Sequence, residues 1–89
     1  MKREKIEYDS KGKWPYDWIE FKIIEEKQVY FDTEKGFVDI EMVVQRKSDG
    51  KFFIFGFTDY GQGDSSLKEE PIVELEEVFP KKVEITVYE

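Results

Sequence analysis

The residues of this 89-residue chain that could do chemistry are carboxylates, neighbouring serines and a glycine-rich loop. The loop, Gly61-Gln62-Gly63-Asp64-Ser65-Ser66, follows an expected strand, as a phosphate-binding loop does. It lacks the third glycine of a dinucleotide-binding fingerprint and the Gly-Lys-Ser/Thr of a P-loop. No helix is expected after it to hold an anion, and the Asp64 carboxylate would repel phosphate. We therefore interpret residues 61–71 as a polar surface loop.

Calcium binding is the second chemistry that the spacing suggests. Asp59 and Glu70 stand at the first and twelfth positions of a notional EF-hand loop. Gly61 and Gly63 occupy the third and fifth positions, which must supply ligands, and Asp64 occupies the position where the turn needs glycine. The spacing is therefore interpreted as coincidence, and we expect no metal site.

Acid–base and nucleophilic catalysis find no support in the remaining residues. The pairs Glu25-Glu26, Glu69-Glu70 and Glu76-Glu77 could supply two carboxylates, but no spacing distinguishes any of them in a chain rich in acids. Ser65-Ser66 has no histidine to activate it, because the chain contains none. We expect no catalytic residue, no cofactor and no enzymatic activity.

Acidic residues are concentrated in one part of the chain. Between residues 59 and 77 there are seven acidic residues and a single basic one, Lys68. This acidic strip consists of Asp59, Asp64, Glu69, Glu70, Glu74, Glu76 and Glu77. Rows of acids can imitate duplex phosphates to a nucleic-acid-binding protein, so the strip is a candidate for filling a basic groove on a partner. The alternative is a rim that only keeps the protein soluble.

The composition of the chain limits the kinds of partner and the location that we expect for the protein. The net charge of −7 repels nucleic-acid phosphates, so direct nucleic-acid binding is not expected, whereas a basic protein partner is electrostatically favourable. The absence of cysteine excludes disulfides and thiolate metal sites. Residues 1–7 are charged with no apolar stretch behind them, so we expect neither a signal peptide nor membrane association and a cytoplasmic location.

The elements that must position these residues centre on the stretch from Phe37 to Tyr60. Apolar and polar residues alternate over 38–45, as in a half-buried strand, and Asp49-Gly50 favours a two-residue type I′ turn. That turn would set Val44 opposite Phe55 and Met42 opposite Phe57. One face would then collect these apolar side chains: Val38, Ile40, Met42, Val44, Phe53, Phe55 and Phe57.

Other segments add strands to this hairpin. Residues 19–31 mix helix and strand signals, and their β-branched and aromatic content favours a strand with a bulge near Glu25-Glu26. Residues 32–36 are expected to turn, with Gly36 at positive φ, and residues 72–79 and 83–87 are expected to be strands. We predict a mainly β fold, a single small antiparallel domain of four to five strands over residues 14–89. It has a central hairpin and little helix, and residues 1–13 precede it as a flexible lead-in.

The chain has more aromatic side chains than one face of a sheet can bury. Trp14-Pro15-Tyr16-Asp17-Trp18 is expected to be either a hydrophobic plug at one end of the sheet or an aromatic anchor for a partner. Phe52 and Ile54 fall on the face opposite to Phe53, so both sides of the hairpin are partly apolar. A sheet without covering helices must curl or pack against another sheet, and we predict a homodimer.

Three stretches resemble parts of small uncharacterised proteins encoded by phages and prophages of Gram-positive bacteria. They are the Trp14-Pro15 entry, the turn Ser48-Asp49-Gly50-Lys51 and the ending from Val78 to Tyr88. Some acidic phage proteins of this style inhibit host defences, and anti-CRISPR proteins are among them. The resemblance implies an inhibitor and carries over neither a functional residue nor a specific target.

The leading hypothesis is therefore a non-enzymatic interaction module that inhibits a host protein by blocking a basic surface. Its expected contacts are the acidic strip together with Trp14, Tyr16 and Tyr60. One alternative is a small-ligand-binding or sequestering protein, with an aromatic pocket between the sheets of a dimer. A second alternative is a structural component of a larger assembly.

Overall fold

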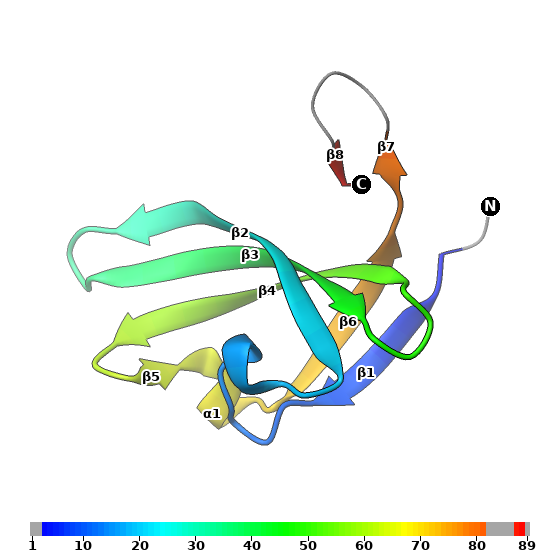
Figure 1. Cartoon of the computed structure of the whole chain (residues 1–89). Coiled ribbons are helices and arrows are strands. Elements are labelled where there is room, and N and C mark those ends of the chain that lie inside the picture. Colours follow the sequence, from blue (N-terminus) through cyan, green and yellow to red (C-terminus); the bar gives the residue numbers. More distant parts are fainter. Residues whose placement is uncertain (1–2, 82–86, 89) are drawn as a thin grey trace.

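The chain forms one antiparallel sheet in the order β1-β6-β4-β3-β2 in the computed structural model, which describes residues 3–81, 87 and 88 (Figure 1). The long strands are β2 (Phe21–Asp32), β3 (Phe37–Arg46), β4 (Phe52–Gly61) and β6 (Ile72–Val78), and the shorter ones are β1 (Lys5–Asp9) and β5 (Asp64–Ser65). The remaining elements are the 3-10 turn η1 (Pro15–Asp17), the helix α1 (Ser66–Glu69) and the pair β7 (Pro80–Lys81) and β8 (Val87–Tyr88). The predicted mainly β fold with one antiparallel sheet and little helix is confirmed.

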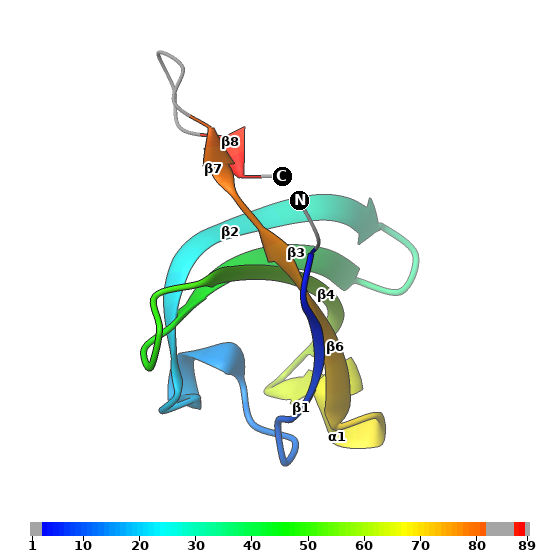
Figure 2. The same cartoon turned by 90° about the vertical axis from the view of Figure 1, so that its right-hand side faces the viewer.

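The sheet curls around its core, as an uncovered sheet must. Figure 2 shows the strands arching over a concave side, with η1 below them. Side chains of the edge strand β1 contact the start of β2 and the residues just before it. The centroid of the Tyr8 ring lies 4.7 Å from that of Trp18 and 5.0 Å from that of Phe21. The Tyr8 hydroxyl also donates to Glu20 at 2.5 Å. These contacts close the open side of the arch.

The central hairpin has the predicted faces but not the predicted turn. Val44 pairs with Phe53 and Met42 with Phe55, a register two residues away from the expected one. A shift of two residues keeps every side chain on its face, so the expected apolar set lies on the core side. The type I′ turn was wrong, because Gly50 alone of the pair has positive φ, at 75°. Asp49 instead accepts hydrogen bonds from Arg46 and closes a longer loop.

Residues 21–32 are a strand, which settles the mixed signals of that segment. Its pairing with β3 slips between Ile23 and Glu25 and again between Gln28 and Tyr30, so the expected bulge is present and a second follows it. The turn after β2 is also as predicted. Gly36 has a φ of 72°, and its N–H donates to the Asp32 carbonyl at 2.7 Å. β2 is an edge strand throughout the described part of the sheet.

Two segments expected to be irregular are ordered. Residues 5–9, placed in the flexible lead-in, form β1 and pair with β6, since Ile6 and Tyr8 alternate toward the core. Residues 61–71, interpreted as a polar surface loop, contain β5 and α1, and Leu67 of α1 is buried in the core. The strand predicted at 83–87 lies outside the described residues except for Val87, which belongs to β8.

The aromatic entry is the hydrophobic plug of the sheet. Trp18 is 4% exposed and stacks on Phe55 with ring centroids 5.0 Å apart, while its indole N–H donates to the Lys13 carbonyl at 3.0 Å. Pro15 is buried, and Trp14 packs edge-on against Phe57 with centroids 5.8 Å apart. Burial of these rings fixes the chain before β2 under the arch.

Candidate functional site

The acidic strip does not form one continuous surface. Alternation along β6 separates its members, because Glu77 pairs with the buried Phe53 on the core side and is 7% exposed. The Glu77 carboxylate accepts the Glu4 N–H at 3.1 Å and is unavailable to a partner. Glu74 and Glu76 lie on the outer side of the same strand, with Glu74 exposed. Asp59 is half-buried and accepts the Gly61 N–H at 2.7 Å.

Three members of the strip gather around Tyr60 at the end of β4. Asp64, Glu69 and Glu70 are exposed, and the Tyr60 hydroxyl donates to Glu69 at 3.5 Å. Desolvation raises the pKa of Tyr60, and the negative charges of Glu69, Asp64 and Glu70 raise this pKa further. We call these four residues the acidic corner. It is the part of the predicted site that the fold brings together.

The backbone beneath the acidic corner is firmly held. β5 pairs with β4, and the Thr58 N–H donates to the Ser66 hydroxyl oxygen at 2.9 Å. Ser65 caps the short helix α1 by accepting the Leu67 N–H at 3.3 Å. Leu67 is buried at the core. The corner therefore presents its carboxylates from an ordered turn and not from a free loop.

The predicted aromatic contacts differ in their availability. Tyr16 is 60% exposed, and its hydroxyl donates to Glu26. That hydrogen bond, with desolvation, raises the pKa of Tyr16 to about 12. Tyr60 is half-buried and packs on Phe37 with centroids 4.5 Å apart. The Trp14 ring packs against Phe57 within the plug, so Tyr16 and Tyr60 remain as candidate contacts for a partner.

At the opposite end of the hairpin, acids are paired with bases. Arg46 contacts Asp49 at 2.6 Å and Glu4 at 3.1 Å, and Lys51 contacts Glu4 at 3.1 Å. The guanidinium of Arg46 also lies 4.9 Å from the centroid of the Phe53 ring. Its hydrogen bond to Asp49 lowers the pKa of that carboxyl to about 2. Acidic charge at this end is thus locally compensated.

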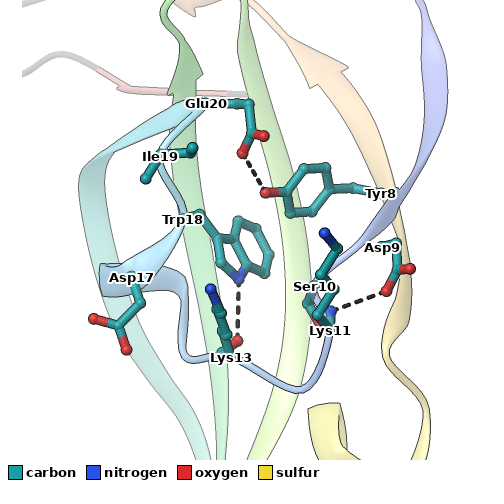
Figure 3. A pocket seen from close by; sticks show the side chains of 9 residues that line it. All are labelled: Tyr8, Asp9, Ser10, Lys11, Lys13, Asp17, Trp18, Ile19 and Glu20. Carbon is teal, nitrogen blue, oxygen red and sulfur yellow. Dashed lines mark hydrogen bonds between the residues drawn. The ribbon is translucent and has the colours of Figure 1, made fainter.

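A small pocket lies at the closure between β1 and the entry to β2 (Figure 3). Its volume is about 130 Å³, and Tyr8, Lys13 and Trp18 are among the residues that line it (Figure 3). Its polar groups bond to each other, as in the Tyr8–Glu20 and Trp18–Lys13 hydrogen bonds. Ligand pockets commonly exceed about 300 Å³, so this pocket fits a structural role in closing the arch.

A larger hollow was missed by the sequence analysis. Three adjoining depressions have volumes of about 290, 370 and 280 Å³. The first two lie over the side of β3 and β4 opposite to the core, and the third lies between Gly56 of β4, the α1 segment and β6. We call them the outer groove; its central residues are Asp39, Glu41, Gly56, Thr58, Ser66 and Glu74. The signal that could have found it is Gly56, a glycine in the middle of an apolar strand.

The described residues contain no cluster of three or more acids that could hold a metal ion. No helix in that part of the chain has the length and apolar character needed to cross a membrane. Comparisons with protein-family models, with curated proteins and with solved structures found no match. The function must therefore be inferred from the residues and their geometry.

Proposed function

We propose that the protein is a non-enzymatic acidic interaction module that inhibits a basic protein by occupying its surface. The acidic corner carries this proposal. Asp64, Glu69 and Glu70 are exposed around one tyrosine, on a turn held by β5, α1 and a buried leucine. An ordered group of carboxylates beside an aromatic ring offers both charge and apolar contact to a basic patch.

The class of target follows from the charge pattern. Within the part of the chain that the structure describes, no salt bridge compensates the acids at the corner, whereas the acids at the Arg46 end are paired with bases. A basic groove that normally holds nucleic-acid phosphates is complementary to such a surface. Because the chain resembles phage proteins that inhibit host defences, we propose that the target is a host-defence protein in the cytoplasm. Binding of this kind weakens steeply as salt is added.

Charge reversal at the corner tests the proposal. Glu69→Lys/Glu70→Lys removes two exposed carboxylates, and Asp17→Lys/Glu34→Lys makes the same change in net charge at exposed positions in η1 and in the turn after β2. Binding of each variant to an oligoarginine peptide is measured by fluorescence anisotropy at low and at high salt. The corner variant should bind at least about tenfold more weakly than the control variant at low salt. Equal losses in the two variants would show attraction to net charge alone and would contradict the proposal.

We also propose that two copies associate through the β2 edge. Ile19 and Phe31, just before β2 and on it, are both more than half exposed. The edge carries Lys22 and Lys27 beside Glu25 and Glu26, so two acidic chains can approach here with less repulsion than elsewhere. Light scattering should give the mass of a dimer at low and at high salt, and Phe31→Lys should yield a monomer. A wild-type mass of one chain would overturn this proposal.

A further inference from the structure

Gly56 occupies a strand position that the fold does not require to be glycine. It lies in the middle of β4, is exposed, and has no positive φ, unlike the turn glycines. A Cβ atom at this position would meet the Ile40 carbonyl oxygen at 3.6 Å, an ordinary van der Waals distance. Glycine inside a strand weakens the strand and often marks close approach by a ligand or another backbone. Its presence here therefore points to something that occupies the space above it.

That space is the middle of the outer groove. Gly56 lines the hollow of about 370 Å³ with Val29 and Thr58, and it also lines the adjoining hollow of about 280 Å³ with Ile72. Val29 and Ile72 are about half exposed, so the walls are partly apolar. A groove with apolar walls and a glycine floor suits an extended peptide segment.

Carboxylates flank the glycine on both sides. Glu41 pairs directly with Gly56 across β3 and β4, and Glu74 of β6 lines the same hollow as Gly56. Paired strands are about 4.8 Å apart, so Glu41 stands directly beside Gly56, while Glu74 borders the hollow on the other side of Gly56, just past the last β4–β6 pair, Ile54 and Glu76. Glu74 has a basic neighbour in Lys5 at 4.0 Å, and Lys27 lies opposite Glu41 on β2. Both glutamates are exposed, and exposed pairs of this kind contribute little.

Aromatic rings form one end of the groove. Tyr30, Phe37 and Tyr60 line the hollow of about 290 Å³, together with Lys35. Tyr60 belongs to the acidic corner as well, and Glu70 of the corner lines the opposite hollow. A guanidinium stacks on aromatic faces and pairs with carboxylates, so the groove combines both kinds of partner that arginine prefers.

We infer that the outer groove binds an extended, arginine-bearing segment of the basic partner, with one arginine side chain above Gly56 between Glu41 and Glu74. This inference rests on the proposed function and specifies how the partner is recognised. Arginines at alternate positions of an extended segment lie on one face, about 6–7 Å apart, so a second one reaches Tyr60 or Glu70. The first arginine fits above Gly56 because glycine has no side chain to fill that space.

The test fills the groove without changing charge. Gly56→Val adds a β-branched side chain at a site where the backbone tolerates one, and Gln28→Val makes a neutral change to valine at an exposed position of β2. The probe is a synthetic peptide that alternates arginine and threonine, beside a peptide in which citrulline replaces arginine. Affinity is measured by isothermal titration at low salt, and the melting temperature reports folding.

We expect Gly56→Val to bind the arginine peptide at least about tenfold more weakly, with an unchanged or higher melting temperature. Gln28→Val should bind as the wild type does, and the citrulline peptide should bind neither. Wild-type affinity in Gly56→Val would overturn the inference that the outer groove binds arginine. If Glu69→Lys/Glu70→Lys still weakened binding in that case, the proposed function would survive. Failure of both variants to alter binding, or no binding by the wild type, would overturn both. Should Gly56→Val fail to fold, Gly56→Ala provides the same comparison with a smaller side chain.

Discussion

Removal of the Trp18 side chain should unfold the arch, because this residue joins the plug, the β1 edge and the core. Trp18 contacts Tyr8, Phe21 and Phe55 with ring centroids 4.7–6.0 Å away, and its N–H is bonded to the Lys13 carbonyl. A buried tryptophan removes about 150–250 Å² from water, worth roughly 4–6 kcal/mol at about 25 cal/mol per Å². Core tryptophan-to-alanine changes cost about 3–5 kcal/mol, against a total of about 4–13 kcal/mol for a domain of this length.

The assay is urea denaturation followed by far-ultraviolet circular dichroism. With a slope of about 1–1.5 kcal/mol per molar urea, Trp18→Ala should lower the midpoint by about 2–5 M or leave the protein unfolded in water. Tyr16→Ala is the control, because Tyr16 is in the same segment and 60% exposed, and its loss should be under about 1 kcal/mol. Equal midpoint shifts in the two variants would refute the role of Trp18 as the plug.

Two further predictions concern the hairpin end and the acidic corner. The pKa of Asp49 is lowered from 3.8 to about 2 by its hydrogen bond to Arg46, so its contribution to stability is present above pH 3.8 and is lost as pH falls through 2. Between about pH 5 and about pH 2, Asp49→Asn should therefore lose less stability than the wild type in urea titrations; a parallel loss would contradict the assignment. Leu67→Ala should lower the free energy of unfolding by about 2–5 kcal/mol and increase hydrogen exchange at α1, whereas unchanged exchange there would show that the corner is not anchored by Leu67.

Side-chain alternation made the core predictable although the turn was not. The faces of the central hairpin follow from a period of two, and a register error of two residues leaves them intact. The turn itself depends on the Arg46–Asp49 contact, which local turn propensity does not encode. β1 escaped prediction for a similar reason. Its pairing with β6 joins residues about 70 positions apart, and only Ile6 and Tyr8 mark its inner face.

The candidate site was predictable in part. Residues 64, 69 and 70 meet around Tyr60 because β5 and α1 fold the chain back along β4. Glu77 was misplaced because a run of acids in the sequence says nothing about which side of a strand each member faces until the pairing is known. The outer groove combines residues from β3, β4 and β6, so no local pattern could reveal it, and Gly56 was its single trace in the sequence.

Nuclear magnetic resonance titration with an oligoarginine peptide tests the central claim most directly, since it locates the binding surface on the folded chain. The backbone amides of Tyr60, Asp64, Glu69 and Glu70 should show the largest shift changes at low salt, and these changes should shrink at high salt. Glu25 and Glu34, which are also exposed acids, should change little. Changes centred on Glu25 and Glu34, or spread evenly over all acidic residues, would contradict the acidic corner as the interaction surface.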